Sequence, residues 1–395
     1  KYSNIIKEHL IDIKDDGSFR LNMNYFDFAT GLKMTNQKFD ELFKNKPRKP
    51  ETEKISNFHM DMAASIQAVT EEIMLKIVKS LRKEYNINNL CLAGGVALNC
   101  VANGIIHKEK IFDKIWIQPA SGDAGGSLGS ALALWHNELD QKRSVNNKDA
   151  MKGSFLGPSF NSDDCINTFK SSGAIFKEYD YDNMIKIAAK ALSEGKALGW
   201  FQGRMEFGPR SLGARSIIAD PRSQNMQKEL NLKVKFRESF RPFAPSIISE
   251  DVNKYFKFND DSPYMLIVSE IKDNLKVYNK NNKELFGIEK LNLKRSNIPA
   301  VTHVDYSARI QTVHKETNPI FYDLIKEFKN ITGCSVLINT SFNVRGEPIV
   351  CNPEDAFKCF MGTNLDMLIC NNFILNKDEQ DSNLKEDYKN KYELD

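Results

Sequence analysis

The stretch GWFQGRMEFGPRSLGARSIIADPR (199–222) and the following KFRESFRPF (235–243) are the parts of this sequence on which its interpretation depends most. The chain has 42 Lys but only 13 Arg, and six of the arginines lie between residues 204 and 241. Arginine is a planar fork that binds phosphate or carboxylate through two hydrogen bonds, so the cluster favours a local anion site. The alternative is a solvated basic face with surface ion pairs. Such a face does not need the Gly, Pro and Phe residues that separate these arginines, and we therefore favour the anion site.

The overall composition is that of a globular protein without a general attraction for nucleic acid or membranes. The chain has 395 residues, enough for two domains, and its 55 basic and 52 acidic side chains leave a net charge of +3. No apolar run approaches the ~18 residues that a membrane helix needs. The seven Cys form no CxxC pair, and most lie in apolar runs. We therefore expect reduced cysteines in a cytoplasmic protein, with neither disulfides nor a zinc site.

Two successive segments share the order strand, Gly-rich turn, helix. Strands are predicted at 90–93 and 114–118, the turns contain Gly94-Gly95 and Gly125-Gly126, and helices are predicted at 99–108 and 128–139. Such turns let backbone N–H groups approach a phosphate, and the helix N-terminus adds partial positive charge. Close helix–strand packing is the alternative explanation. Asp123, in the second turn, is either a turn former or helix cap, or a ligand for a metal or for Mg-nucleotide.

The polar residues 137–154 mark the predicted domain boundary. A long helix is expected at 59–85, on its apolar spacing. After the boundary we expect helices at 183–194, 224–234, 318–329 and 353–361, and strands at 197–201, 244–248, 264–271, 300–304, 310–313, 334–339 and 367–375. The charged tail is expected to be disordered. This pattern indicates an α/β protein with domains at 1–140 and 159–376, a linker at 141–158 and the tail at 377–395.

Two further arginines stand in turn-like contexts outside the cluster. Arg309 begins a predicted strand, and Arg345 follows a buried strand in a loop, a common place for ligand groups in α/β folds. We expect Arg210, Lys235, Arg241, Arg309 and Arg345 to converge on one compact dianion. Each of them alone has an ordinary surface role as its alternative, and the shared context of turns favours convergence.

Six motifs in this order resemble one family. They are LAGGVALNCVANG (92–104), QPASGDAGGSLGSAL (118–132), GRMEFGPRSLGARSIIADPR (203–222), FRESFRPFAPSI (236–247), HVDYSARIQTV (303–313) and NTSFNVRGEPIVCNPEDAF (339–357). From about residue 20 to 375 the chain resembles the O-carbamoyltransferases of the nodulation protein U and cephamycin/tobramycin type. The resemblance implies the second lobe of an actin/sugar-kinase-like (RNase H-like, TsaD-like) ATPase domain, followed by a YrdC-like α/β domain.

The same resemblance implies a biosynthetic reaction in two stages. Carbamoyl phosphate and ATP would form carbamoyl-adenylate, and the carbamoyl group would then pass to a hydroxyl of a small molecule or glycan. Carbamoyl phosphate would be bound by Arg210, Lys235, Arg241, Arg309 and Arg345, and ATP by Arg237, Ser341 and Asn343. The adenylate would lie against Gly94, Gly95, Val96, Asn99, Gly125 and Gly126. Asp123 matches the family's metal ligand, usually for iron, and Mg would accompany ATP.

One departure from the family concerns the part upstream. The His-x-x-x-His metal ligands of the family are absent from this sequence, which predicts that the chain is truncated at its N-terminus or split. The alternative function is therefore a non-catalytic nucleotide- or anion-binding subunit that needs a partner carrying the missing lobe. A homodimer or such a partner chain are the assemblies we expect, with no nucleic acid and no membrane, and the carbamoyl acceptor stays open.

Overall fold

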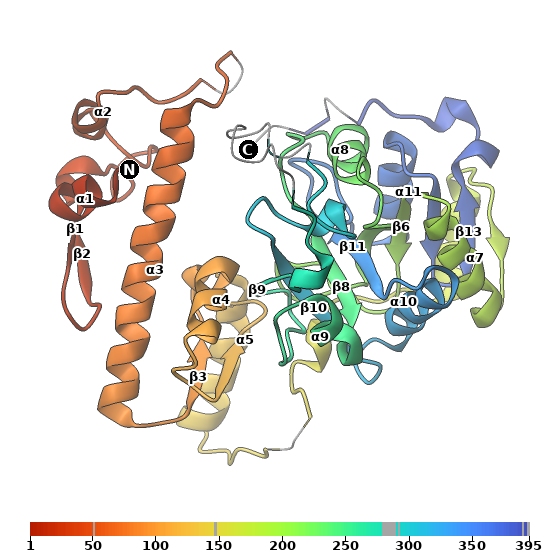
Figure 1. Ribbon diagram of the computed structural model, residues 1–395. Coiled ribbons are helices and arrows are strands. Elements are labelled where there is room, and N and C mark those ends of the chain that lie inside the picture. Colours follow the sequence, from red (N-terminus) through yellow and green to blue (C-terminus); the bar gives the residue numbers. More distant parts are fainter. Residues whose placement is uncertain (50–51, 146–147, 279–289, 291–292, 389–390, 393–395) are drawn as a thin grey trace. The chain divides into compact units, whose positions relative to one another are not determined.

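The computed structural model describes residues 1–49, 52–145, 148–278, 290, 293–388 and 391–392, and it divides into two compact units (Figure 1). Unit 1 comprises Lys1–Cys91 and Ala102–Trp116, and unit 2 comprises Leu92–Val101 and Ile117–Asp395. In the described part of the chain, no helix is both long enough and apolar enough to cross a membrane.

Unit 1 is built on the long helix α3 (Asn57–Tyr85), which confirms the helix predicted at 59–85. It begins at Ser56 with a capping box and ends at Asn86, which has the left-handed conformation that terminates helices. Its apolar side packs Val69 and Ile73 into a core with Phe43. The smaller elements are α1 (Ser3–Ile5), η1 (Ile6–Leu10), β1 (Ile11–Ile13), β2 (Phe19–Leu21), η2 (Met23–Tyr25) and α2 (Gln37–Phe43), with β1 and β2 antiparallel.

Both predicted strand–turn–helix segments are present. Strands β3 (Asn89–Leu92) and β4 (Lys114–Ile117) form a small sheet. After β3 come η3 (Gly95–Leu98) and α4 (Cys100–Lys108). After β4 comes α5 (Ala124–Ala133), which starts four residues earlier than predicted and continues into η4 (Leu134–Glu138). The glycines of the second turn therefore belong to the first turn of α5.

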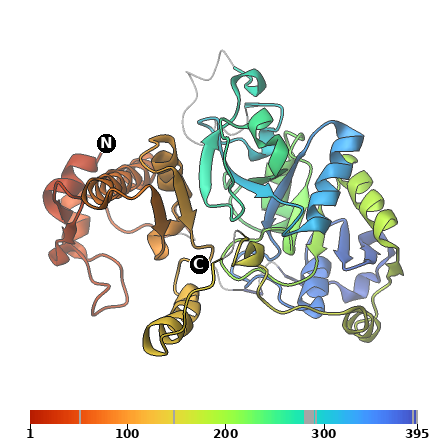
Figure 2. The same ribbon diagram turned by 90° about the horizontal axis from the view of Figure 1, so that it is seen from below.

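In the described residues of unit 2, nine strands form one mixed sheet (Figure 1 and Figure 2). In spatial order they are β5 (Lys177–Glu178), β13 (Phe373–Asn376), β12 (Met367–Cys370), β6 (Leu198–Phe201), β7 (Arg215–Ala219), β11 (Val336–Ser341), β8 (Ala244–Ile248), β10 (Ser307–Val313) and β9 (Ile267–Glu270). The pairs β12–β6 and β10–β8 are parallel, and the other pairs are antiparallel. The central strands β6, β7 and β8 are buried along their whole length.

Two pairs of helices pack on this sheet. Helix α10 (Pro319–Thr332) packs against α7 (Tyr181–Ser193) and contacts β8 and β11, and α11 (Pro353–Gly362) packs against α6 (Ser162–Ser171) and contacts β6 and β12. Proline at the first position and an Asn cap start α10 and α11. Shorter helices are η5 (Lys152–Ser154), α8 (Met226–Glu229), η6 (Leu230–Val234), η7 (Ser249–Asp251), α9 (Val252–Tyr255), η8 (Asp273–Leu275), η11 (Pro299–Val301), η12 (Lys377–Glu379) and η13 (Ser382–Leu384).

Some sequence expectations for unit 2 are wrong in detail. Residues 300–304 are not a strand, because Pro299 starts the short helix η11. The single strand expected at 367–375 is the hairpin β12–β13, which turns at Asn371, a residue with φ of 50°. Strand β7 and helix α6 lie where the sequence analysis placed no element. Residues 377–388, assigned to a disordered tail, contain η12 and η13 and the buried Tyr388.

Candidate functional site

The Arg-rich stretch (199–222) contains the loop between β6 and β7, and a buried carboxylate organises this loop. Glu206 Oε1 accepts backbone N–H bonds from Leu212 at 2.6 Å, Ala214 at 2.8 Å and Arg215 at 3.4 Å. Burial raises the pKa of Glu206, and these N–H donors act against that rise. Gly208, at φ of 141°, passes so close to the Pro119 carbonyl that a Cβ would collide with it. Only glycine therefore fits at this point of the loop.

Three arginines of the stretch act as braces. Arg215 is fully buried, and its guanidinium lies 3.5 Å from the centre of the Phe201 ring. It donates to the carbonyls of Gln202, Gly203, Ala214, Pro158 and Cys351 at 3.0–3.4 Å. Arg204 donates to the Leu156 carbonyl at 2.8 Å, and Arg222 pairs with Asp220 at 2.6 Å. These contacts leave the three side chains committed to the protein's own acceptors.

A cavity of about 270 Å³ gathers most of the predicted substrate ligands in unit 2. Its lining residues are Lys235, Arg237, Arg241, Ser341, Asn343, Val344, Arg345, Gly346, Glu347 and Pro348. They come from two segments, the loop after η6 and the end of β11 with the loop that follows it. A backbone hydrogen bond from Arg345 N to Lys235 O, at 3.1 Å, joins the two loops. The structure thus brings together Lys235, Arg241 and Arg345 of the predicted dianion site and all three predicted ATP ligands.

Lys235 is the buried centre of this cavity. Its Nζ donates to Ser341 O at 2.9 Å, Ser341 Oγ at 3.1 Å, Asn343 O at 2.8 Å and Asn343 Oδ1 at 2.5 Å. Burial, and after it the positive charge of Arg237, lowers the pKa of Lys235 to about 7. The four oxygen atoms favour the ammonium form and oppose that shift. Lys235 therefore ties the loop after β11 into the cavity, and an added anion would favour its charged form further.

The arginines of the cavity are held by a carboxylate and an aromatic ring. Glu238 pairs with Arg241 Nε at 3.0 Å and with Arg345 Nη1 at 3.3 Å. Burial acts to raise the pKa of Glu238, but its backbone hydrogen bond and these two arginines together lower it. Arg237 donates to Asn231 Oδ1 at 2.7 Å and lies over the Phe243 ring at 5.0 Å. Burial and Arg241 lower the pKa of Arg237 to about 10.

Arg210 and Arg309 do not line this cavity and form a second group beside Cys100. Burial, and after it the charge of Arg309, lowers the pKa of Arg210 to about 10. Burial also lowers the pKa of Arg309, and the nearby Cys100 thiol acts against that fall. Arg309 is close enough to lower the pKa of Arg237 as well. The five predicted dianion ligands are therefore split into a group of three and a group of two. Arg309, in the second group, is near enough to the cavity to act on Arg237.

The predicted adenylate ligands lie along η3, from its N-cap to its C-cap, and in the first turn of α5. Gly94 has φ of 91°, and a Cβ at Gly94, Gly95 or Gly126 would meet open space. Gly125 passes directly against the Ala120 carbonyl, where a Cβ would collide. The side chain of Val96 is exposed, and Asn99 follows η3 as its last capping residue. Open space over these backbones leaves room for a phosphate at either turn.

Asp123 is an exposed residue at the N-cap position of α5, and its side chain makes no capping hydrogen bond. In the part of the chain that the structure describes, no three His, Cys, Asp or Glu side chains come together in a way that could hold a metal ion. An iron site needs several protein ligands. The residues present around Asp123 therefore do not fit iron.

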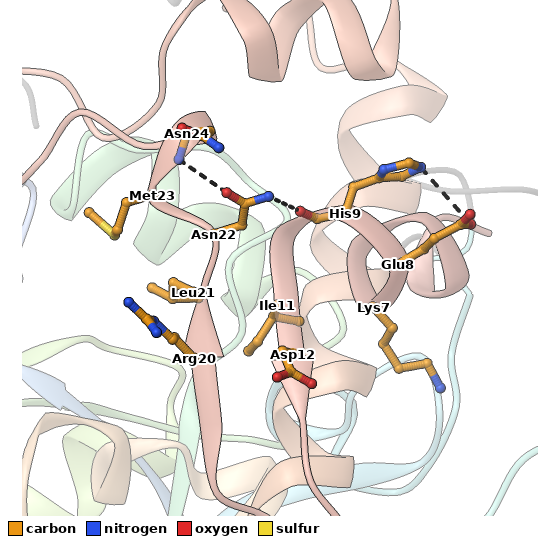
Figure 3. A pocket seen from close by; sticks show the side chains of 10 residues that line it. All are labelled: Lys7, Glu8, His9, Ile11, Asp12, Arg20, Leu21, Asn22, Met23 and Asn24. Atoms are coloured by element: carbon orange, nitrogen blue, oxygen red, sulfur yellow. Dashed lines mark hydrogen bonds and ion pairs between the residues drawn. The ribbon is translucent and has the colours of Figure 1, made fainter.

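A larger hollow, of about 480 Å³, lies in unit 1 and contains none of the predicted site residues. Figure 3 shows that Lys7, Glu8 and His9 reach it from η1, Asp12 from β1 and Arg20 from β2. The side chain of Asn22, also in the lining, donates to the His9 carbonyl at 2.9 Å. Its charged side chains are mostly exposed, and Lys7 and Asp12 pair with Glu72 and Lys14. The cavity in unit 2 has a buried lysine and three partly buried arginines, so we take that one as the candidate site.

Three glutamates of the site were not among the residues predicted from the sequence. They are Glu206, which organises the Arg-rich loop, Glu238, which pairs with two cavity arginines, and Glu347, which lines the cavity. Glu238 stands between Arg237 and Arg241 in the sequence, so its position gave a signal for an ion pair. Nothing local distinguishes Glu347 from a surface glutamate.

Comparison with known proteins gives two family matches. The model for the carbamoyltransferase N-terminus matches residues 1–132, and the model for the carbamoyltransferase C-terminus matches residues 189–377. An uncharacterised protein of Synechocystis sp. is 53% identical over 98% of this chain and 64% of its own length. Nodulation protein NolO of Bradyrhizobium diazoefficiens is 37% identical over 81% of this chain and 55% of its own length. Nodulation protein U of Rhizobium tropici is 28% identical over 80% and 49%, respectively.

The chain thus spans about half to two thirds of the length of these relatives. The match to the family's N-terminal model begins at residue 1. This match is partly at odds with the expectation that the N-terminal lobe is missing. Residues 1–132 themselves match the family model for the carbamoyltransferase N-terminus.

Proposed function

The chain belongs to the carbamoyltransferase family, and on that premise we propose that its unit 2 makes carbamoyl-adenylate for transfer to a hydroxyl group. Carbamoyl phosphate and water would yield carbamate and phosphate. A carbamate oxygen would then attack the α-phosphorus of ATP, and pyrophosphate would leave with the electron pair of the broken P–O bond. The hydroxyl oxygen of the acceptor would attack the carbonyl carbon of the mixed anhydride, and AMP would leave.

The observation that supports this proposal most is the cavity lined by Lys235, Arg237, Arg241 and Arg345. The cavity has a volume of about 270 Å³, and its cations would face the phosphate groups of the two substrates. Negative charge builds on phosphoryl oxygens during both proposed steps, and cations that are already positioned stabilise it without reorganisation. Ser341 and Asn343 accept hydrogen bonds from Lys235, and in this proposal these two residues bind ATP.

The ion pairs of Glu238 suggest how this cavity is kept ordered before substrate binds. The Glu238 carboxylate pairs with the guanidinium groups of Arg241 at 3.0 Å and Arg345 at 3.3 Å. A phosphate would take over those donors, because it offers more acceptor oxygens and more negative charge than a single carboxylate. Arg210 and Arg309 would meet the same substrate from the side of Cys100, as the family resemblance implies.

We propose that the adenylate then lies against Gly94, Gly95, Val96, Asn99, Gly125 and Gly126. Open space over Gly94, Gly95 and Gly126 supports this placement. In this proposal residues 1–140 correspond to an ATPase-like lobe, 141–158 to a linker and 159–376 to a YrdC-like domain. Magnesium would enter with ATP, and Asp123 would be a metal ligand only in company with groups that the described residues do not supply.

Pyrophosphate release from ATP, measured with and without carbamoyl phosphate, tests the proposal. We expect release that depends on carbamoyl phosphate and is lost in Arg345→Met, whose side chain lines the cavity. The matched control is Arg204→Met, because Arg204 is exposed and donates to the Leu156 carbonyl. Folded wild-type protein that releases no pyrophosphate in the presence of both substrates would contradict the proposal.

A second candidate is a nucleotide- or anion-binding module that works with a partner. This candidate is favoured by the comparison, because the chain spans only part of the length of its relatives. Calorimetry would then show binding of ATP or carbamoyl phosphate without turnover by the chain alone. Turnover would appear when a partner carrying the remaining region of the relatives is added.

A further inference from the structure

Glu347 is a carboxylate in the wall of a cavity that is otherwise lined by cations. It is 8% exposed, and it shares the lining with Lys235 and Arg345. A carboxylate in this place works against anion binding in two ways, because it repels the anion and can itself pair with the cations. A site for phosphate therefore needs some means of holding this carboxylate in one orientation.

Two tyrosines near the C-terminal end of the chain contact one oxygen of this carboxylate. Tyr388 donates its hydroxyl proton to Glu347 Oε1 at 2.5 Å. The Tyr392 hydroxyl lies 3.1 Å from the same oxygen and 3.2 Å from the Tyr388 hydroxyl, and its proton can go to either. Hydrogen bonds to a charged acceptor are about twice as strong as those between neutral groups.

The side chain of Tyr388 is packed into the fold. Its side chain is 3% exposed, and a Cβ at Gly362, the last residue of α11, would collide with the Tyr388 ring. Lys391 Nζ lies 4.8 Å from the centre of the ring and pairs with Glu386 at 2.5 Å. The contact with Glu347 thus comes from a packed residue in a segment that the composition alone predicts to be disordered.

The other oxygen of Glu347 and its backbone extend this contact into the substrate cavity. Glu347 Oε2 accepts the Val344 N–H at 2.8 Å, and the Glu347 carbonyl accepts Asn343 Nδ2 at 2.6 Å. Asn343 Oδ1 in turn accepts from Lys235 Nζ at 2.5 Å. A continuous chain of hydrogen bonds therefore runs from the two tyrosines to the buried lysine.

We propose that Tyr388 and Tyr392 are positioning residues of the phosphate cavity, which hold the Glu347 carboxylate away from the cations and fix the loop of residues 343–347. The inference rests on the proposed function, because it assigns the cavity to a phosphate-bearing substrate. Without the hydroxyl donors, Glu347 is free to turn toward Lys235 and Arg345. It then competes with the substrate, and the loop loses its fixed shape.

The test uses Tyr388→Phe and Tyr392→Phe, which keep the rings and remove the hydroxyls. Calorimetry with inorganic pyrophosphate measures the Kd, and hydrogen exchange measures protection of residues 343–348. We expect the Kd to rise about tenfold in Tyr388→Phe, less in Tyr392→Phe, with faster exchange in that loop. Tyr181→Phe is the matched control, because its hydroxyl donates to Asp323 at 2.9 Å between α7 and α10.

A double substitution separates positioning from simple loss of stability. In a Glu347→Gln background no negative charge can compete for the cations, so adding Tyr388→Phe should leave the Kd for pyrophosphate within about twofold. An equal loss of affinity in both backgrounds, or unchanged exchange at 343–348 in Tyr388→Phe, would overturn the inference. If the wild-type chain binds no pyrophosphate, the proposed function fails, while the exchange measurement still decides whether the tyrosines hold the loop.

Discussion

Replacing Glu206 by Ala should destabilise unit 2 more than any surface change, because this one carboxylate organises the loop between β6 and β7. Its Oε1 atom accepts the N–H groups of Leu212 at 2.6 Å and Ala214 at 2.8 Å, with Arg215 N more distant at 3.4 Å. In Glu206→Ala these donors stay buried without a partner. A buried donor left unsatisfied costs about 1–3 kcal/mol, so the two short bonds give a loss of about 4 kcal/mol.

Glu206→Gln separates the hydrogen bonds from the charge. The amide oxygen can still accept both short N–H bonds, so we expect a loss of stability within about 1 kcal/mol of wild type. Wild type and Glu206→Gln should also differ in how their stability depends on pH. Burial raises the folded pKa of Glu206 above its ordinary value of 4.5. The stability that this group contributes is therefore complete below pH 4.5 and is lost as the pH rises through the folded pKa. Glu206→Gln lacks this loss, so its stability relative to wild type should increase from pH 4.5 to pH 7.5.

Trp200 provides the probe for this measurement. It is fully buried on β6, and its Nε1 donates to the Gly213 carbonyl, at 3.0 Å, in the loop that Glu206 holds. Trp116 and Trp135 are 41% and 52% exposed, and replacing both by Phe leaves Trp200 as the reporter. A loss of about 4 kcal/mol should lower the urea midpoint by about 1–2 M.

The matched control is Glu354→Ala, on the exposed side of α11, where Glu354 pairs with Lys358 at 2.6 Å. Its midpoint should correspond to a loss of no more than about 0.5 kcal/mol. The reasoning is refuted if Glu206→Ala loses no more than this control does. It is also refuted if Glu206→Gln is as unstable as Glu206→Ala, because the hydrogen-bond acceptor would then not be what matters.

Three further predictions concern the cations and their partners. Arg215→Met leaves buried carbonyls without their donor, and the urea midpoint should show a loss of about 3–5 kcal/mol, whereas a midpoint equal to wild type would contradict its bracing role. Burial and Arg237 lower the pKa of Lys235 to about 7, so this lysine loses its charge as the pH rises from 7 to 9. The affinity for inorganic pyrophosphate, measured by calorimetry, should therefore fall over this range by up to about tenfold per pH unit. Lys235→Met should not show this dependence on pH. Glu238→Gln removes a competing charge beside Arg345 and should bind pyrophosphate about tenfold more tightly in the same assay, and weaker binding would show that Glu238 acts mainly by ordering the arginines.

The sheet of unit 2 could be predicted where its strands are apolar and not where they are polar. Strand β8 (Ala244–Ile248) is buried throughout and apolar except for Ser246, and it lies where the sequence predicts it. Strand β7 starts with Arg215 and Ser216, which are both completely buried. Hydrophobic pattern carries no signal for a buried polar residue, because its burial depends on partners from distant segments. Such partners become visible only in the fold.

The hairpin β12–β13 shows a different kind of failure. The run from Met367 to Leu375 is apolar on both sides of Asn371-Asn372, and the sequence analysis treats it as one strand. Asn tolerates the left-handed conformation, and Asn371 adopts it with φ of 50°. The turn signal was therefore present in the sequence, but the length of the apolar run outweighed it.

The cations of the site were easier to predict than its acids. Lys235, Arg241 and Arg345 line one cavity together with Arg237, whereas Arg210 and Arg309, which the convergence argument places with them, do not line it. Glu347 could not be singled out, because its role depends on Tyr388, 41 residues further along the chain. A contact of this range has no local pattern, and the charged composition around Tyr388 favours the opposite expectation of disorder.

The structure also sorts the arginines of the Arg-rich stretch by what their nitrogen atoms already do. Arg215 spends its donors on carbonyl groups of the protein, so an anion could bind it only by breaking those bonds. Arg210 Nε, by contrast, is buried without a hydrogen-bond partner in the part of the chain that the structure describes. An unmade bond of this kind costs about 1–3 kcal/mol, and a bound phosphate oxygen would recover that cost. Arg210, in the loop before β7, therefore has a buried donor that an anion could use, whereas Arg215, the first residue of β7, uses its donors to hold the loop.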